Sequence, residues 1–445
     1  MQKGILLLTI FLGMTLSLQA QEVEKITLQE AIEISLENNY QLKQARNNLD
    51  LAEERELSAK GDFLPSINGS LNAGRREGSQ FIPGTDNFVN TVSKSISGSV
   101  NMGLPIFAGF ENINNLRSSQ YNKRSEEENL QRVRETVIFQ TASNYLQVIL
   151  DKELLEIDRE NLAASQQTLE QVKAQVEVGS RPTVDLYNQE ATVANNELQV
   201  VNSENALNAS KLQLIRQLQV DPLQQYEFST PEVNPQNVNA QDYNLRQLVN
   251  TAMDNRSDLR SDQLGIQSLE HQLSVAKASL YPSLSLNAQI SSDYSDRIDF
   301  DFSDQFYDQN VVKFIGLSLN VPIFNNFNRR ANIQSQMVTY KNAKLNLENT
   351  ELQVVQDVNQ AYNDYQSYVK QLESSRKALT AAEKTYETQQ ERYQVGAGTL
   401  IELSDANAQF VQAQANTTQA LFRVIFQQKL LDYYIGRLDQ DIELN

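Results

Sequence analysis

The side chains that could carry out chemistry in this chain are mostly carboxylates. Its 445 residues include 56 Asp and Glu, 38 Lys and Arg, one histidine and no cysteine. The histidine, His271, stands beside Glu270 in a stretch with helical periodicity, and no nucleophile or metal-ligand cluster accompanies it. Without cysteine the chain can form neither disulfides nor thiolate catalytic or metal sites. We therefore expect a protein that is not an enzyme and that uses no cofactor and no dedicated metal site.

The densest group of carboxylates is a run of six aspartates within residues 293–310. Their spacing does not match an EF-hand loop, and the glutamate that would close such a loop is absent. The sequence therefore favours a solvated loop over a calcium site. The six are Asp293, Asp296, Asp299, Asp301, Asp304 and Asp308.

Three other carboxylates follow glycine-containing breaks in helical patterns. Asp185 comes after the break at Gly179, and Glu402 and Asp405 come after the break at Gly396. Glu402 and Asp405 are three residues apart, so they share one face of a helix. By themselves, these positions favour acids that the positive end of a helix dipole stabilises in the first turn.

The elements around these acids occur twice. Leu104-Pro105-Ile106-Phe107 returns as Val321-Pro322-Ile323-Phe324, and 322 − 105 gives an offset of 217 residues. The same offset relates further anchors without a gap. They are Leu28 and Leu245, Pro65 and Pro282, Tyr145 and Tyr362, Val178-Gly179 and Val395-Gly396, and Leu186 and Leu403. This period is too long for a solenoid repeat of about 20–50 residues. It predicts a duplicated half.

Each half contains two segments in which apolar and polar residues alternate. In the second half Leu286 and Leu317 fall on the apolar side, and Ser285 and Ser318 on the polar side. Alternation over about ten residues is the length of a transmembrane β-strand. We predict β-hairpins over 66–105 and 283–322, with the strands at 66–76, 95–104, 283–290 and 312–321 and polar loops at 77–94 and 293–310.

Long helical patterns occupy most of the remaining chain. Residues 110–178 and 327–395 contain neither proline nor glycine, and each would form a helix about 100 Å long. Helices at 183–219 and 399–435 would follow sharp turns, and Thr27 with Glu30 forms a capping box at the start of one helix over 26–60. The predicted halves are 21–220 and 243–437, joined by the proline-containing linker 221–242 and followed by a tail at 438–445. None of the nine prolines falls inside a predicted long helix or strand.

Composition indicates how such elements could be stabilised. Apolar residues make up 40% of the chain, tryptophan is absent and the net charge is −18, which predicts burial in long seams or against copies of the chain and argues against nucleic acid as a partner. Residues 1–20 predict a secretory signal peptide.

Four membrane-length strands cannot close a barrel, because closure needs at least eight. Two or three copies would have to combine, giving eight or twelve strands.

Taken together, the duplicated half, the Pro-Ile-Phe segments and the two turn segments resemble the TolC family of outer-membrane efflux channels over essentially the whole mature length. The turn segments are 178–186, with sequence VGSRPTVDL, and 395–403, with sequence VGAGTLIEL. The resemblance implies a mixed fold: a long, coiled-coil-like α-helical barrel and a transmembrane β-barrel that closes only in a homotrimer. It implies a channel in the outer membrane of a Gram-negative bacterium, extending into the periplasm. It also implies work with a periplasmic adaptor and an inner-membrane pump in tripartite efflux or type I secretion.

The same resemblance implies roles for the residues near the turns. Asp185, Glu402 and Asp405 would form a pore constriction. The adaptor-contact residues would be Val178, Gly179, Ser180, Arg181, Val395, Gly396, Ala397 and Gly398. Gly398 stands where some members carry arginine, so a lock that depends on arginine is not expected in the second half. The absence of cysteine excludes the lipid anchor on an N-terminal cysteine that many members carry.

One alternative from another class remains open: a secreted coiled-coil scaffold or adhesin with a β-domain. Four alternating segments flanked by prolines favour the channel, because a scaffold does not need them. The sequence selects neither the exported substrate nor the pump, and it does not say whether divalent cations bind the acidic mouth.

Overall fold

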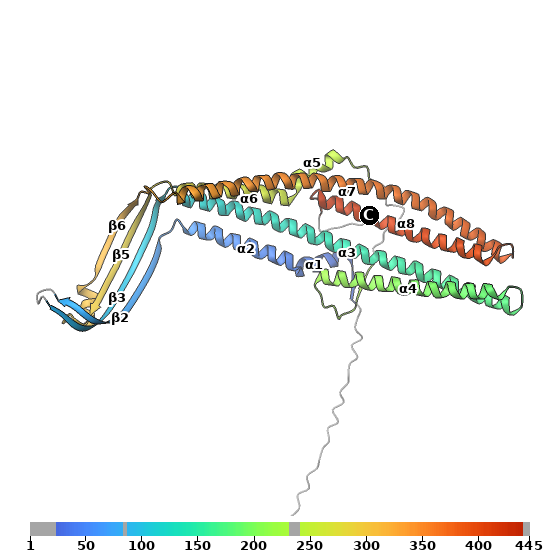
Figure 1. Cartoon of the computed structure of the whole chain (residues 1–445), viewed down its shortest axis with the longest axis horizontal. Helices are drawn as coiled ribbons and strands as arrows, with labels where there is room; N and C mark the ends of the chain where they lie inside the picture. The colour runs from blue at the N-terminus through green and yellow to red at the C-terminus, as the bar shows by residue number, and fades with distance from the viewer. Residues whose placement is uncertain (1–23, 83–86, 231–240, 439–445) are drawn as a thin grey trace, which may run out of the picture.

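The structure is a computed structural model, and it describes residues 24–82, 87–230 and 241–438. The predicted signal peptide at 1–20 lies outside these residues. The chain is a long rod with a four-stranded sheet at one end, tilted away from a bundle of helices (Figure 1). Two helical hairpins end at the opposite end of the rod, and we call their turns the tips.

The strands of the sheet pair in the order β2-β3-β5-β6, all antiparallel. Their bounds are Ser66–Ile82, Asn87–Ala108, Ser283–Ser295 and Val312–Asn320. Strands β2 and β6 form the two edges.

Pairing places the apolar residues on one face. Leu104 lies opposite Leu286, and Leu286 lies opposite Leu317; residues opposite one another in such a ladder share a face. Ser285 lies opposite Ser318, on the other face. The predicted division between Leu and Ser positions therefore holds in this sheet, and the apolar face is open: Leu317 is 66% exposed.

The polar loop predicted at 77–94 is wrong for most of its length. Strand β2 continues to Ile82 and β3 begins at Asn87, and pairs such as Glu77 with Val92 extend the ladder. Cross-strand pairing satisfies the backbone of this segment, and the rings of Phe81 and Phe88, which lie opposite one another, have centroids 5.6 Å apart. Pro105 also lies inside β3, against the prediction, at a register shift between Pro105 and Phe107. A bulge of this kind accommodates a residue that cannot donate a ladder hydrogen bond.

The loop predicted at 293–310 is folded. Strand β5 runs to Ser295, and a π-helix, η1, covers Asp304–Gln309. The buried Gln305 organises the segment: its Nε2 donates to the carbonyls of Ser295, Ile298 and Phe300 at 3.2, 3.2 and 2.7 Å. The prediction of an irregular loop is therefore wrong, because one buried amide organises the turn from within, whereas all six aspartates are exposed. Among the described residues, no group of three or more acidic or histidine side chains is arranged to hold a metal ion.

The single helix predicted over 26–60 is two helices, α1 at Leu28–Asn38 and α2 at Tyr40–Gly61. The chain bends at Asn39, whose side chain accepts from the backbone nitrogens of Gln41 and Leu42 and so starts α2. The second half bends at Arg256, between α5 at Leu245–Asn255 and α6 at Ser257–Ala278. Because 256 − 39 is 217, both bends fall at the offset found in the sequence.

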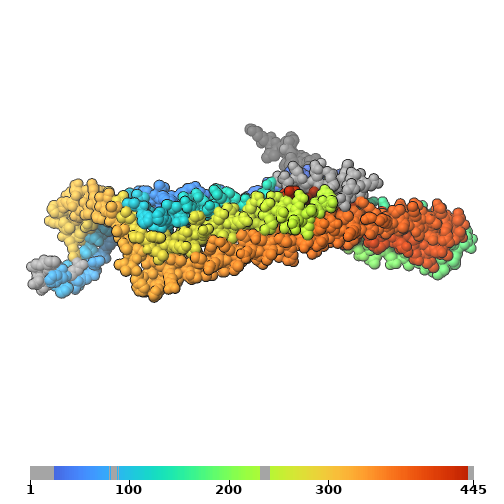
Figure 2. Space-filling view, turned by 90° about the horizontal axis from the view of Figure 1, so that it is seen from above, coloured from blue at the N-terminus to red at the C-terminus, as the bar shows by residue number. Residues whose placement is uncertain are grey.

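The longest helices are α3, Glu111–Glu177, and α7, Asn328–Gln394, each 67 residues long. Helices α4, Thr183–Leu218, and α8, Leu400–Tyr434, return along them from the tips. Next to the sheet the packing order is α2-α3-α6-α7, and toward the tips it is α4-α3-α8-α7; Figure 2 shows α6 and α7 side by side along the rod. No described helix is both long and apolar enough to cross a membrane.

The main apolar core lies at mid-length, where all of α1, α3, α4, α5, α7 and α8 contribute. Two short strands pair there in parallel, β1 at Glu24–Ile26 and β4 at Tyr226–Phe228. The predicted linker 221–242 thus contains a strand that sequence analysis missed. The hydroxyl of the buried Tyr145 lies 3.0 Å from the Ile26 carbonyl and 2.6 Å from the Ser229 carbonyl, which ties α3 to this ribbon.

Candidate functional site: the helical tips and the mid-length network

Both tips are built by the same backbone motif. In the first, the Gly179 nitrogen donates to the Val176 carbonyl and the Ser180 nitrogen to the Gln175 carbonyl, each at 2.9 Å. This is a Schellman motif, in which the glycine takes a left-handed conformation; φ is 74° at Gly179 and 76° at Gly396. The second tip repeats both bonds 217 residues later. The glycines are therefore needed for the turn itself.

The surfaces of the two tips are apolar and open. Val178 and Val395 are 78% and 79% exposed, and Val184 and Ile401, also 217 residues apart, are 58% and 61% exposed. A Cβ built at Gly179 or Gly396 would have nothing within 4 Å. Each tip thus presents two branched apolar side chains and a bare stretch of backbone.

Of the three acids predicted for the pore, Asp185 and Glu402 lie in the first helical turn after a tip and Asp405 lies in the next turn. Glu402 closes a capping box on α8: the Thr399 nitrogen donates to its carboxylate at 3.0 Å, and this bond, chiefly, lowers the pKa of Glu402. Asp405 is exposed, and Asp185 is half-buried in the first turn of α4. The capping role of Glu402 is the structural role that the sequence favoured before the resemblance was considered.

The two tips are joined by a contact that sequence analysis missed. The Arg181 guanidinium lies over the ring of Tyr393, 4.4 Å from its centroid. Tyr393 is 4% exposed and packs with Val172, Leu400 and Leu403, so residues of α3, α7 and α8 meet there. Burial raises the pKa of Tyr393. The aromatic residue two positions before Val395 was the available signal, but nothing in the sequence placed it near Arg181.

A polar cavity of about 140 Å³ lies beside this contact. Amide and hydroxyl side chains dominate its lining, and the buried hydroxyl of Tyr393 has no hydrogen-bond partner among the described residues. Asn407, which lines it, donates to Asn161 at 2.8 Å.

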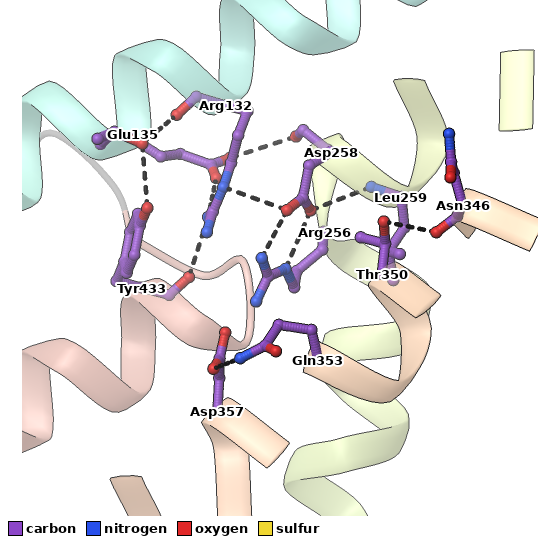
Figure 3. A network of polar contacts seen from close by, with 12 residues as sticks. Arg132, Glu135, Arg256, Asp258, Leu259, Asn346, Thr350, Gln353, Asp357 and Tyr433 are labelled. Atoms are coloured by element: carbon purple, nitrogen blue, oxygen red, sulfur yellow. Dashed lines mark hydrogen bonds and ion pairs between the residues drawn. The ribbon is translucent and has the colours of Figure 1, made fainter. Parts of the chain in front are cut away.

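Mid-way along the rod, a charged network joins α3, α6 and α8 (Figure 3). Asp258 accepts from Nε and Nη2 of Arg256 at 3.0 and 2.5 Å, and Arg132 Nε lies 3.7 Å from the same carboxylate. Arg132 also donates to Glu135 at 3.2 Å and lies 4.1 Å from the ring centroid of Tyr433. The two arginines and two carboxylates balance in charge.

Burial shapes the ionisation of this network. Burial opposes the ionisation of Asp258, but the hydrogen bonds from Arg256 and the charges of both arginines together hold its pKa below its ordinary value. Nη1 of Arg256 is buried and has no hydrogen-bond partner among the described residues. The network therefore depends closely on Asp258.

Comparison with known proteins shows which family has a similar sequence. The family described as outer membrane efflux protein matches the chain twice, over residues 31–218 and 248–436. The TolC outer membrane protein of Vibrio cholerae is 23% identical over 448 residues, covering 98% of this chain and 97% of the relative. The outer membrane efflux protein BepC of Brucella suis is 21% identical over 420 residues, covering 93% and 86%.

Solved structures share the fold. The CmeC outer membrane channel of Campylobacter jejuni superposes with a TM-score of 0.81 at 17% identity, covering 94% of this chain and 87% of that one. CusC gives a TM-score of 0.79 at 18% identity, with 92% of each chain covered. Members of this family are channel proteins rather than enzymes. With two family matches that together span both halves, the chain belongs to the outer membrane efflux protein family.

Proposed function

We propose that this chain is one third of an outer-membrane export channel that receives substrates from a periplasmic adaptor and an inner-membrane pump. The observation that carries the proposal is the sheet: it has one apolar face, two unpaired edges and helices about 100 Å long continuing from it. An unpaired edge in lipid leaves backbone groups without hydrogen bonds, at a cost of several kcal/mol each. Copies of the chain would remove both edges by pairing β6 of one with β2 of the next.

The helices support the same contact between neighbouring copies of the chain. Helices α2 and α7 are the outer members of the packing order near the sheet. On α7, Val338, Leu345 and Leu352 recur every seven residues and are 45%, 61% and 71% exposed. On α2, Leu51 and Leu57 are 49% and 60% exposed. These apolar rows would pack together between neighbouring copies, so that three chains close a twelve-stranded barrel and a helical barrel around one pore.

Matching bounds support the proposed duplication. Helices α1, α2 and α3 begin and end 217 residues before α5, α6 and α7. In the proposed layout a signal peptide at 1–20 precedes two repeats, 21–220 and 243–437, and the mid-length linker joins them. Two such repeats in three chains would give the pore an approximate sixfold arrangement.

The tips are the proposed contact with the adaptor. The segments 178–181 and 395–398 each begin with an exposed valine followed by bare glycine backbone, which would let another helical hairpin approach closely. Asp185, Glu402 and Asp405 follow directly, and three copies would place nine carboxylates around the mouth. Such a ring would concentrate cations and exclude anions.

The oligomer is tested by mass measurement of the membrane-extracted protein in detergent. We expect a trimer that resists mild heating and dissociates on boiling. A monomer that stays inserted in the membrane would contradict the proposal.

The adaptor contact is tested by replacing Gly179 or Gly396 with a bulky residue such as tryptophan. Export in cells should be lost while the trimer remains in the outer membrane, because the added ring covers the open tip surface and the positive φ at both glycines strains the turn itself. Tryptophan at the exposed Leu223, away from the tips, is the matched control. Normal export by both tip variants would remove this part of the proposal.

The acidic mouth is tested with Glu402→Gln and Asp405→Asn together. Glutamine can still close the capping box, so the change removes charge and keeps the helix start. We expect weaker cation selectivity in a planar bilayer under a salt gradient and less block by divalent cations. If the reversal potential and the block do not change, these acids do not line the mouth.

A further inference from the structure

A groove lies on the apolar face of the sheet across β2, β3 and β5, and the β2–β3 hairpin continues beyond it to Ile82 and Asn87. The volume of the groove is about 540 Å³. Leu71 and Gly98 lie opposite one another in the ladder, as do Val100 and Ile290, and Leu71, Val100 and Ile290 are half or more exposed. A Cβ at Gly69 would meet no atom within 4 Å. The missing side chain at Gly69 thus leaves the groove open between larger apolar residues.

Aromatic side chains from η1 border this groove. Phe306 lies over Gly98, where a Cβ would come within 3.0 Å of its ring, and Ser292 Oγ donates to the Phe306 carbonyl at 2.6 Å. Phe306 stacks on Phe302 with centroids 5.0 Å apart, and Tyr307 is 68% exposed. Aromatic rings that are partly exposed are typical of the membrane–water interface.

One basic residue stands beside the groove on the same face. Lys313 lies opposite Ile290 in the ladder, and its side chain is exposed. No carboxylate within the described residues lies within 4 Å of its ammonium group. A lysine on a lipid-facing surface is costly at the bilayer midplane and is accommodated near the interface.

The length of β6 fixes the level of Lys313. Strand β6 has nine residues, Val312–Asn320, and a strand of about that length spans the hydrocarbon layer. Its helix-proximal end is Asn320, so Lys313 falls at the opposite boundary, which in the proposed channel is the outer leaflet. Headgroup phosphates lie at this level, and acyl chains begin just below it.

We propose that this groove is a binding site for a phosphorylated glycolipid of the outer leaflet, with the upper part of one acyl chain between Leu71, Val100 and Ile290. The ammonium of Lys313 pairs with a phosphate, and the exposed ring of Tyr307 packs on a sugar. The inference rests on the proposed channel, because it needs the apolar face to meet lipid.

The test uses the detergent-purified trimer incubated with lipid A, which carries phosphates, sugars and acyl chains, and in parallel with phosphatidylethanolamine. Native mass spectrometry counts the lipids retained. We expect up to three lipid A molecules per wild-type trimer, and retention about fivefold weaker in Lys313→Ala, as for loss of one lysine near an anionic membrane surface. Lys313→Arg should keep binding, and Gly69→Leu, which fills the groove without removing charge, should lose it.

The matched control is Lys43→Ala, which removes an exposed lysine from α2 and should bind as wild type does. Equal retention by wild type and Lys313→Ala, or equal retention of the two lipids by wild type, would overturn the lipid site while the trimer remains. Failure to obtain a trimer from the wild-type chain would instead contradict the proposed channel. The two failures are therefore distinguishable.

Discussion

The two halves of the chain share their backbone and differ in the contacts between them. Both bend after one short helix, both extend one 67-residue helix and both turn at a glycine with φ near 75°. At the bend, however, Asn39 caps its own helix, whereas Arg256 reaches Asp258 in a network with α3 and α8. At the tip, Arg181 covers Tyr393 of the other half, and its counterpart 217 residues on is Gly398. The backbone at the bends and turns is thus repeated, while the side chains that cap the helices at the bend and join the tips differ between the halves.

The largest expected effect is at the bend. Replacing Asp258 with alanine leaves the buried guanidiniums of Arg256 and Arg132 without their shared carboxylate, and breaking a buried pair in this way costs about 3–5 kcal/mol. The counterpart in the first half is Gln41, because 258 − 217 is 41, and it is exposed. Gln41→Ala should change stability by less than about 0.5 kcal/mol. Thermal unfolding followed by circular dichroism measures both, and equal shifts would show that the two bends do not differ.

A smaller effect is expected in the sheet, where the halves should behave alike. Leu317→Arg in the second half and Leu104→Arg in the first, both opposite Leu286 in the ladder, place charge on the apolar face, at a cost of about 2–4 kcal/mol near the midplane. Both should reduce the amount of trimer in the outer membrane. Ser318→Arg, on the opposite face, should be tolerated, and equal loss in all three variants would refute the assignment of the faces.

The contact between the tips is expected to contribute less. Arg181→Gly gives the first tip the residue of the second and removes a cation–π contact of about 0.5–2 kcal/mol. In single-channel recordings we expect the open fraction to rise, because the two hairpins of a protomer separate more readily. Tyr393→Phe keeps the ring under Arg181 and should behave as wild type does. An unchanged open fraction in Arg181→Gly would limit the contact to local packing.

The smallest expected effect is a pH dependence at the bend, since only part of the network energy is linked to protons. The folded pKa of Asp258 lies below the ordinary aspartate pKa of 3.8, so its contribution is complete above about pH 3.8 and is lost as the pH falls through the folded pKa. The stability difference between wild type and Asp258→Asn should therefore shrink in that acidic range. A difference that stays constant down to pH 2 would contradict the ionised state of Asp258.

Some errors of the sequence analysis have one physical origin. Heptad spacing continues through Asn39, so periodicity could not show that its side chain would accept hydrogen bonds from the next turn and bend the chain. Residues 77–82 form strand because they pair with 87–92, and pairing partners are not visible in composition. The role of Gln305 could not be predicted from the sequence, because its side chain donates to three carbonyls that come together only when the segment folds.

The candidate site shows the same division. The glycines and acids at the tips follow from spacing and from the family resemblance, whereas the Arg181–Tyr393 contact joins residues 212 positions apart in the sequence. Tyr145 and Tyr362 occupy equivalent positions at the 217-residue offset. In the second half, however, it is Tyr365 that is fully buried, and its hydroxyl accepts a hydrogen bond from the Gln241 backbone nitrogen. An offset can identify equivalent positions, but it cannot identify which side chain fills a given space.

By itself, the sequence determined the repeated order of helices and strands, the apolar face of the sheet and the glycine turns. These depend on near neighbours: periodicity along one helix or strand, proline and glycine at breaks, and caps three residues away. Only the tertiary structure decided the charge network at the bend, the tie between the tips, the folded aspartate segment and the groove beside Lys313. Each of these joins side chains that are distant in sequence, and their interaction depends on burial and on distances of a few ångströms that only the packed chain sets.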